Sequence, residues 1–597
     1  MSHTFHIPVL GLAFSIDTPI KVAHYGISSV VSIVDDVLLE RMREFHATKS
    51  SKNFYPISSK SPDYRAMRIT AYLNLLKEIV DDQFDCLKRS EFVEGSEISK
   101  YFNLLPSESS LKELYNRMLA TSDKKYKESL QSELREKMEC GAIDVNIMSK
   151  VDKINYDANG DSLGERFTDA VAALRGFAQS NLNSSLVLSA GMNPRLYASL
   201  ENFTDFYPNK EKELRKKIIL KVSDFRSAFI QAKFLAKKGL WISEFRIESG
   251  LNCGGHAFAT GGYLLGPILE EFKQRRQEMI DSLVDIYKSA LIDKGIQITK
   301  VPSQKLTVQG GIGTSRENNF LINHYNLDGT GWGSPFLLVP EATNVDIETL
   351  EALEGATSQD FYISGSSPLG VPFNNFRRSS AEALRLERIS KGRPGSPCKK
   401  KFLVSNIEFT EQPICTASRE FQNLKINQLK AANLTEDEHN RQFDLITEKV
   451  CLCEGLATSA YLKNGILKPK ENVAVAICPG PNLAFFSRSF TLAEMVQHIY
   501  GKVDLLSKAD RPNLFVNELK LYVEYFKKDV SQHVGQFNDK KSKYFIKFKE
   551  QLFRGIDYYK SLVPQLKNES EIYKTKMLNE LYDLEKLLTI ESHVSHD

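Results

Sequence analysis

With 597 residues the chain is too long for one ordinary domain, and its composition, 42% hydrophobic and 26% charged, is typical of a soluble globular protein. The 78 basic and 75 acidic residues nearly cancel to a formal net charge of +3, which argues against a large nucleic-acid-binding surface. No stretch approaches the roughly 20 apolar residues that a membrane helix needs.

The start of the chain and its cysteines both indicate a reducing compartment. Met1-Ser2-His3-Thr4 leads directly into an apolar run without a basic segment or a cleavage pattern, so no signal peptide is predicted. Eight cysteines are few for this length and do not have the pattern of a disulfide framework. We therefore expect a cytoplasmic protein that is not attached to a membrane.

The first elements form a strand, helix, strand unit. Residues 7–14 are predicted as a short buried strand, and Asp17-Thr18-Pro19 as the start of a helix that ends at Gly26. Residues 29–34 are β-branched and are predicted as a second strand. Such a unit implies parallel pairing of the two strands.

The next part of the chain, residues 37–140, breaks this alternation. It is charged, and its apolar residues, such as Leu73, Leu76 and Val80, recur at helical spacing. The stretch from Leu111 to Met138 is rich in lysine and glutamate. We expect a helical insertion after the second strand.

Alternation of strands and helices resumes after residue 140. The further strands are predicted at residues 143–148, 185–188, 218–222, 243–247, 306–308 and 329–336. About eight strands, each followed by a helix or a helical insert, predict a (β/α)8 TIM barrel, with an open doubly wound sheet as the alternative. The barrel is assigned to residues 1–36 and 141–380, a cysteine-containing extension to 381–490, and a C-terminal helical region to 491–597.

Two glycine turns lie at the ends of the last two predicted strands. The first is Gln309-Gly310-Gly311-Ile312-Gly313 and the second is Gly331-Trp332-Gly333-Ser334. Backbone N–H groups of such turns can hold a phosphate, and the last two strands of a TIM barrel are its usual phosphate site. The alternative is that these glycines serve packing only.

A histidine stands at the end of another predicted strand. In Gly254-Gly255-His256 the two glycines leave little steric obstruction beside the imidazole. A histidine can accept or donate a proton near neutral pH, so His256 is the candidate acid or base. The alternative is a hydrogen-bonded core histidine.

These motifs together resemble the FMN-dependent nitronate monooxygenase (2-nitropropane dioxygenase) family, to which the FMN-dependent enoyl-[acyl-carrier-protein] reductases are similar. The resemblance covers roughly residues 7–36 and 141–345. Its motifs are Asp144-Val145-Asn146-Ile147, the segment from Glu248 to His256, Gly310-Gly311-Ile312, and Gly333-Ser334.

The resemblance implies FMN at the barrel mouth, with its phosphate on the last two turns and His256 as a candidate catalytic base or substrate-orienting group. A lysine at a strand end, Lys221, would stabilise reduced flavin. The residues expected to bind the cofactor are Ala13, Phe14, Asn146, Lys221, Glu248, Gly254, Gly255, Gly310, Gly311, Ile312, Gly313, Gly333 and Ser334.

The reaction itself is left open by these motifs. We expect an FMN-dependent oxidoreductase that acts on a small molecule or an acyl group, with NAD(P)H or O2 as a partner and monooxygenase chemistry among the options. One alternative is a flavin-free lyase or isomerase that binds phosphate on the same turns. The other is a non-catalytic binding or scaffold barrel.

Cysteines cluster after the predicted barrel. The four with a candidate role as metal or iron–sulfur ligands are Cys415, Cys451, Cys453 and Cys478, with Cys398 upstream. Four thiolates could hold zinc or a cluster, and a proline directly after Cys478 is known from ferredoxin-like sequences. Ordinary buried cysteines and redox-active thiols remain the alternatives.

Overall fold

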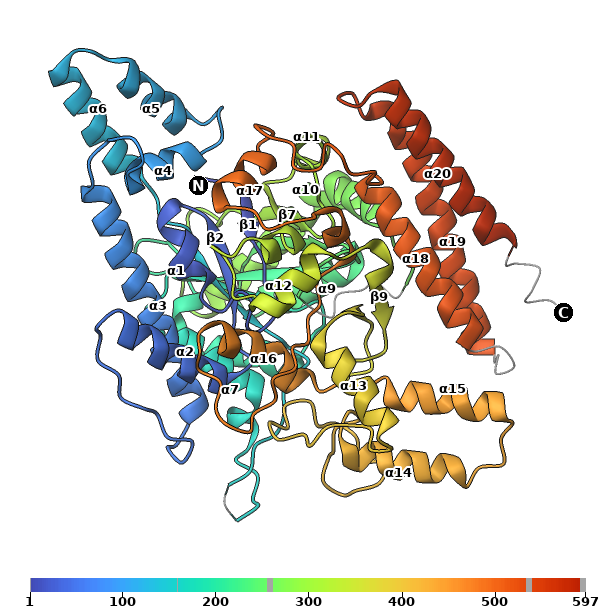
Figure 1. The fold of residues 1–597 in the computed structure, drawn as a ribbon. Coiled ribbons are helices and arrows are strands. Elements are labelled where there is room, and N and C mark those ends of the chain that lie inside the picture. Colours follow the sequence, from blue (N-terminus) through green and yellow to red (C-terminus); the bar gives the residue numbers. More distant parts are fainter. Residues whose placement is uncertain (1, 158, 255–260, 533–538, 591–597) are drawn as a thin grey trace.

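A computed structural model describes residues 2–157, 159–254, 261–532 and 539–590. Eight parallel strands follow one another around a closed barrel (Figure 1). They are β1 (Phe5–Ile7), β2 (Ser28–Ser32), β3 (Ile143–Ile147), β4 (Ser184–Leu188), β5 (Lys216–Val222), β6 (Ile242–Glu248), β7 (Lys305–Gln309) and β8 (Gly329–Gly331). Because β8 pairs with β1, with Phe5 opposite Thr330, the predicted TIM barrel is confirmed and the open sheet is excluded.

The strands were predictable because both of their faces are buried. In β5, for example, Ile218, Ile219 and Leu220 are all at most 2% exposed, which produces the continuous apolar run of a parallel sheet. The first and last strands differ from the prediction. The strand β1 ends at Ile7 because Pro8 has no N–H to donate, and the apolar residues up to Phe14 form a buried loop instead.

Helices surround the barrel. They are α1 (Thr18–Val22), α2 (Asp36–Lys49), α3 (Tyr64–Arg89), α7 (Asp169–Gln179), α8 (Pro194–Ser199), α9 (Phe225–Ala236), α10 (Leu265–Asp293) and α11 (Ser315–Tyr325). Helix α3 packs along α7, so the early part of residues 37–140 belongs to this ring. The helices α4 (Glu97–Leu104), α5 (Ser110–Ala120) and α6 (Lys124–Lys137) project from it (Figure 1).

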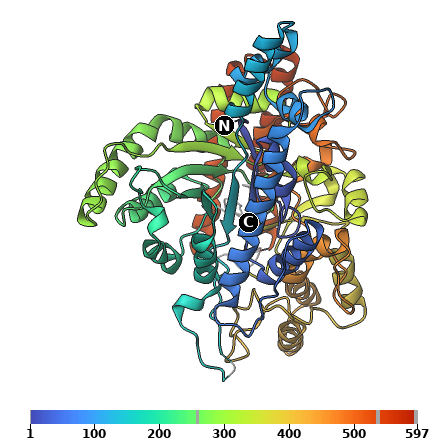
Figure 2. The same cartoon turned by 90° about the vertical axis from the view of Figure 1, so that its left-hand side faces the viewer.

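The chain after β8 adds a second layer. It contains an antiparallel pair, β9 (Phe361–Ser364) and β10 (Phe373–Phe376). Its helices are α12 (Ile347–Glu354), α13 (Ser380–Ser390), α14 (Arg419–Lys430), α15 (Glu436–Thr447), α16 (Leu452–Lys463), α17 (Leu492–Ile499), α18 (Leu514–Gln532), α19 (Asp539–Leu562) and α20 (Glu571–Ile590). Figure 2 shows the yellow and orange segments on the side of the barrel opposite the green helices.

Two contacts fix the position of this second layer. Helices α18 and α19 pack against α10 of the ring, and β10 and α16 contribute residues to a cavity at the barrel mouth. Among the described residues, no helix combines the length and the hydropathy that crossing a membrane would require.

Candidate active site

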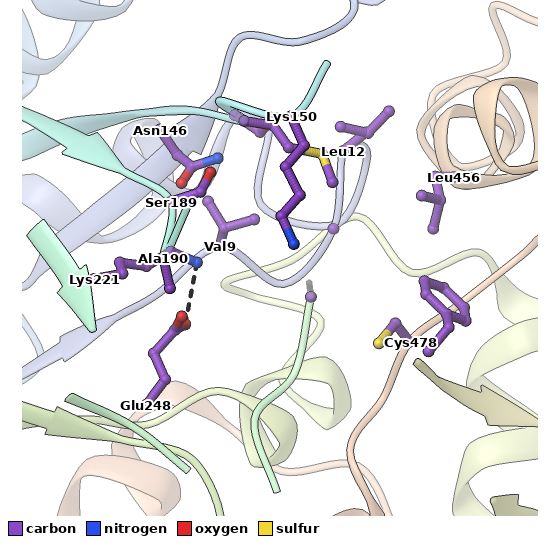
Figure 3. Close-up of a pocket in the computed structure, with 15 residues that line it drawn as sticks. Val9, Leu12, Asn146, Lys150, Ser189, Ala190, Lys221, Glu248, Leu456 and Cys478 are labelled. Carbon is purple, nitrogen blue, oxygen red and sulfur yellow. Dashed lines mark hydrogen bonds and ion pairs between the residues drawn. The ribbon is translucent and has the colours of Figure 1, made fainter. Parts of the chain in front are cut away.

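A cavity of about 90 Å³ lies at the mouth of the barrel, at the carboxyl ends of the strands (Figure 3). Active sites of TIM barrels lie at this end, because the loops after the strands meet there. The polar side chains that line it are those of Ser32, Asn146, Lys150, Ser189, Lys221 and Glu248. Four of the sequence-predicted site residues, Asn146, Lys221, Glu248 and Gly254, are thus brought together.

An ion pair is the centre of this cavity. The Nζ atom of Lys221 in β5 lies 3.1 Å from Oε1 of Glu248 in β6. The same oxygen accepts hydrogen bonds from Nδ2 of Asn252 at 2.6 Å and from Nε2 of Gln309 at 2.7 Å. Within the described residues, the other carboxylate oxygen of Glu248 is buried and has no hydrogen-bond partner. A buried carboxylate with one free acceptor can bind a donor on a ligand.

The opposite wall of the cavity comes from β3 and the loop that follows it. Asn146 is in register with Ser32 of β2, and both side chains face the mouth. Figure 3 shows the amine of Lys150 pointing toward the middle of the cavity. Two lysines, one carboxylate and one amide therefore line a small space, which suits a ligand with an anionic or hydrogen-bonding edge.

Distant parts of the chain close this space. Cys478, Leu456 of α16 and Phe373 of β10 line it, and the N–H of Gly254 donates to the carbonyl of Cys478 at 3.0 Å. Gly254 has φ +75°, and a Cβ there would lie 2.2 Å from the carbonyl oxygen of Val9, so only glycine fits.

Several predicted site residues have other positions. Ala13 and Phe14 are buried in the core, and from that loop Val9, Gly11 and Leu12 line the cavity instead. The two remaining members of the Gly-Gly-His motif, Gly255 and His256, lie outside the described residues. The role of His256 therefore stays a prediction.

The first glycine turn, Gly310 to Gly313, is packed by the chain itself. The guanidinium of Arg511 donates to the carbonyl of Gly311 and to Oε1 of Glu317, each at 2.7 Å. The N–H of Gly313 donates to Oε2 of Glu317 at 2.9 Å, and a Cβ on Gly311 would lie 2.5 Å from Leu251. The chain itself therefore occupies the N–H of Gly313, one of the donors expected to hold a phosphate.

The remaining turn residues are packed as well. Gly333 lies against Cys253 and Pro8, and the hydroxyl of Ser334 lies 2.7 Å from where a Cβ on Gly480 would stand. Gly310 faces Asn252 in the same way, and the carbonyl of Ile312 accepts from Asn482 at 3.0 Å. Neither turn contributes to the described lining of the mouth cavity. The predicted role of the two turns in holding a phosphate stays a prediction.

Sequence reasoning missed the residues that fill these turns. Arg511 is 200 positions from Gly311, and Asn482 is 170 positions from Ile312. No local pattern around Arg511 distinguishes it from a surface arginine, although its side chain is only 5% exposed.

The cysteines that follow the barrel gather in one region. Cys415, Cys453 and Cys478 share one buried cluster, with Cys398 and Cys451 packed against it, and Cys478 also lines the mouth cavity. Among the described residues, no set of three His, Cys, Asp or Glu side chains is arranged to hold a metal ion. The predicted metal or iron–sulfur site on Cys415, Cys451, Cys453 and Cys478 is therefore not supported by the described side chains, although these cysteines lie in one region.

Comparison with known proteins gives a limited likeness. No family model matches the sequence, and no curated protein matches it. Among solved structures, the enoyl reductase domain of MlnA from the macrolactin biosynthesis cluster from Bacillus amyloliquefaciens is 13% identical, with a TM-score of 0.31, over 75% of this chain and 88% of that chain. FabK from Thermotoga maritima is 12% identical, with a TM-score of 0.29, over 68% of this chain and 86% of that chain.

The resemblance to enoyl reductases that the motifs indicate is thus repeated among the structural neighbours. A likeness with so low an identity and TM-score says nothing about the cofactor or the reaction. Both must be inferred from the residues of the site.

Proposed function

We propose that the barrel is an oxidoreductase of the flavin-dependent enoyl reductase and nitronate monooxygenase type. The observation that carries the proposal is the convergence of Asn146, Lys221 and Glu248 on one cavity at the strand ends. Their positions in the sequence are those that resemble the flavin-binding motifs of these families. The substrate would be an unsaturated acyl group, a nitronate or O2.

The cavity residues fit the polar edge of a flavin ring better than the turns fit its phosphate. Lys221 and Lys150 supply cations, Asn146 supplies an amide, and Glu248 has a buried oxygen free to accept from a ring N–H. The glycine turns are filled by Arg511, Glu317 and the segment around Gly480. We therefore assign no phosphate contact to Gly311 or Ser334.

A bound flavin would supply the hydride or electron transfer that the protein residues cannot perform. The residues of the chain would hold and orient it. A cation at the position of Lys221 favours an anionic, reduced ring, and the Glu248 carboxylate keeps that lysine in place at 3.1 Å. Leu456, Phe373 and Leu12 make the rest of the wall apolar and limit access of water.

Flavin titration tests the proposal directly. The protein as purified is unfolded, its flavin is removed, and the refolded chain is titrated with riboflavin and with FMN while flavin fluorescence is followed. We expect both ligands to bind with affinities within about threefold of each other, because the turns leave the phosphate without a partner. Absence of binding by either flavin, together with a colourless purified protein, would contradict the proposal.

A second function is favoured by the packing of the turns. If the C-terminal region has permanently replaced a cofactor phosphate, the barrel serves as a scaffold that displays its additional helices. The same titration separates the two functions, since a scaffold binds neither flavin. A phosphate-binding lyase or isomerase has less support, because it needs the turns that Arg511 and Glu317 fill.

A further inference from the structure

The loop between α13 and α14 contains two cysteines of one cluster, because Cys398 packs against the buried group that includes Cys415. Ser396 and Ser418 close its base: the N–H of Ser396 donates to the carbonyl of Ala417 at 3.0 Å, and the N–H of Arg419 donates to the carbonyl of Ser396 at 2.8 Å. A second bridge, between Asn406 and Ile414, lies further along the loop. Cys398 follows Ser396 by two residues, and Cys415 precedes Ser418 by three.

The two thiols are in direct contact. The side chains of Cys398 and Cys415 form a hydrogen bond with each other, and neither is in a disulfide. Cys398 is partly exposed, whereas Cys415 is 3% exposed. One sulfur can therefore be reached from solvent while the other is covered, which is the arrangement of an attacking and a resolving thiol.

The surroundings make the two thiols unequal. The hydrogen bond from Cys415, and then the N–H and the charge of Lys401, lower the pKa of Cys398 to about 7. The same hydrogen bond, together with burial, raises the pKa of Cys415. Cys398 is thus the better nucleophile near neutral pH, and Cys415 remains protonated until it reacts.

The geometry points to Cys398 and Cys415 as a reversible dithiol–disulfide pair that reacts with a low-molecular-weight disulfide. The thiolate of Cys398 attacks one sulfur of that disulfide, forms a mixed disulfide and releases one thiolate. Cys415 then loses its proton, attacks the Cys398 sulfur and releases the second small thiol. Two protein thiols are oxidised to one disulfide, and one small disulfide is reduced to two thiols.

The neighbouring cysteines are less suited to this reaction. Burial raises the pKa of Cys453, which is only 7% exposed, and burial also raises the pKa of Cys451. The described side chains do not provide a set of three ligands around these sulfurs for a metal ion. These observations favour a two-sulfur reaction over a four-sulfur metal site.

The disulfide would affect the barrel through the loop that it closes, because residues of this loop contact the barrel wall. Between the two cysteines, Lys400 forms an ion pair with the buried carboxylate of Asp35, which caps α2 directly after β2. Phe402, in the same loop, lies with its ring centre 5.8 Å from the guanidinium carbon of Arg65. Oxidation would therefore hold this part of the loop against the barrel wall.

The test uses the full-length protein in buffers that range from reduced to oxidised glutathione. Remaining thiols are alkylated, and peptides are mapped by mass spectrometry. We expect a peptide pair linked through Cys398 and Cys415 in oxidised buffer, and its complete loss on return to reduced buffer. This measurement needs no variant and therefore does not depend on whether a variant folds.

Three variants assign the roles. In Cys415→Ser the attack stops at a mixed disulfide, so glutathione should stay on Cys398; in Cys398→Ser, buried Cys415 should take up no glutathione. The control Cys86→Ser removes an exposed cysteine of α3 and should leave the linked peptide unchanged. The proposal is overturned if Cys398 and Cys415 stay reduced in all buffers, or if the purified protein carries zinc or iron in equal amount to the chain and Cys398→Ser loses it.

Discussion

The two sides of the barrel mouth both lie at the carboxyl ends of strands, but one side is open and the other is filled. On the side of β3, β5 and β6, polar side chains keep a cavity between them. On the side of β7 and β8, two glycine turns are filled by residues from far along the chain, chiefly Arg511 and Gly480. A glycine turn therefore marks only a place where other atoms can approach the backbone closely. Those atoms can belong to a ligand or to the protein itself.

The largest effect should come from removing the side chain that fills the first turn. Arg511→Ala deletes three hydrogen bonds, to Asn482, Glu317 and Gly311, and leaves Glu317 as a buried carboxylate without its ion partner. Loss of one member of a buried pair costs about 3–5 kcal/mol of unfolding free energy. Guanidinium chloride unfolding, followed by circular dichroism, measures it.

A nearby arginine provides the control. Arg316 pairs with Glu569, but its side chain is 59% exposed, so Arg316→Ala should cost no more than about 1 kcal/mol. Equal unfolding midpoints for the two variants would mean that the packed turn contributes little to the stability of the barrel.

A smaller loss should follow when a methyl group is added to the filled turn. A Cβ at Gly311 would lie 2.5 Å from a methyl of Leu251 and 2.7 Å from one of Leu514, and the residue has φ +79°. Overpacking costs about 1–3 kcal/mol and the left-handed backbone about 1 kcal/mol more, so Gly311→Ala should lower the unfolding free energy by about 2–4 kcal/mol.

The matched control separates the two contributions. Gly295 has φ +73° with nothing within 4 Å of an added Cβ, so Gly295→Ala should cost only the backbone part, about 1 kcal/mol. If both variants lose the same amount, Gly311 is not tightly packed, and its turn could still admit a ligand.

The sequence predicted the barrel well because its signals are local. Each buried parallel strand, such as β5 with Ile218, Ile219 and Leu220, is a short apolar run between polar residues, and eight such runs in alternation with helices specify the closed sheet. Boundaries failed where apolar residues serve a loop, as at Phe14, because burial alone does not distinguish a strand from a packed turn.

Part of the site could also be predicted, because the signals for its strand-end residues are local in the sequence. Asn146, Lys221 and Glu248 are at strand ends, and closure of the barrel necessarily brings strand ends together. The occupant of the glycine turns depends on contacts such as that between Arg511 and Gly311, which are long-range in sequence. A turn that receives a guanidinium and one that receives a phosphate have the same local sequence, so only the tertiary structure separates them.

The open side of the mouth should respond in ligand binding. Lys221→Met removes the cation beside Glu248, but the carboxylate keeps its hydrogen bonds from Asn252 and Gln309. We expect flavin affinity to fall about tenfold, equivalent to about 1.4 kcal/mol.

The control for this change is on the same strand. Lys217 is exposed near the amino end of β5, at the far end of the barrel from the mouth, so Lys217→Met should leave flavin affinity unchanged. An equal loss of affinity in both variants would show that general charge, and not the position of Lys221, governs binding.

The smallest effect should be a dependence of the filled side on pH, through His498. The N–H of Leu505 donates to Nδ1 of His498 at 3.2 Å, so Nε2 carries the proton and donates to the carbonyl of Gly313 at 2.8 Å. Burial lowers the pKa of His498, and nearby Arg511 lowers it further while Asp504 opposes this. The folded state therefore holds a neutral imidazole that the unfolded chain would protonate near pH 6.5.

The pKa of His498 is lower in the folded state than in the unfolded chain. Its contribution to the unfolding free energy is therefore fully present above the pKa of the unfolded chain and is lost as pH falls below about 6.5. Between pH 7 and pH 5 we expect wild-type protein to lose up to about 1 kcal/mol more than His498→Gln, in which the amide can still donate to Gly313. Parallel unfolding midpoints for the two proteins over this range would mean that the closed turn tolerates a charged imidazole, and that the filled side of the mouth is less tightly sealed than the contacts of Arg511 indicate.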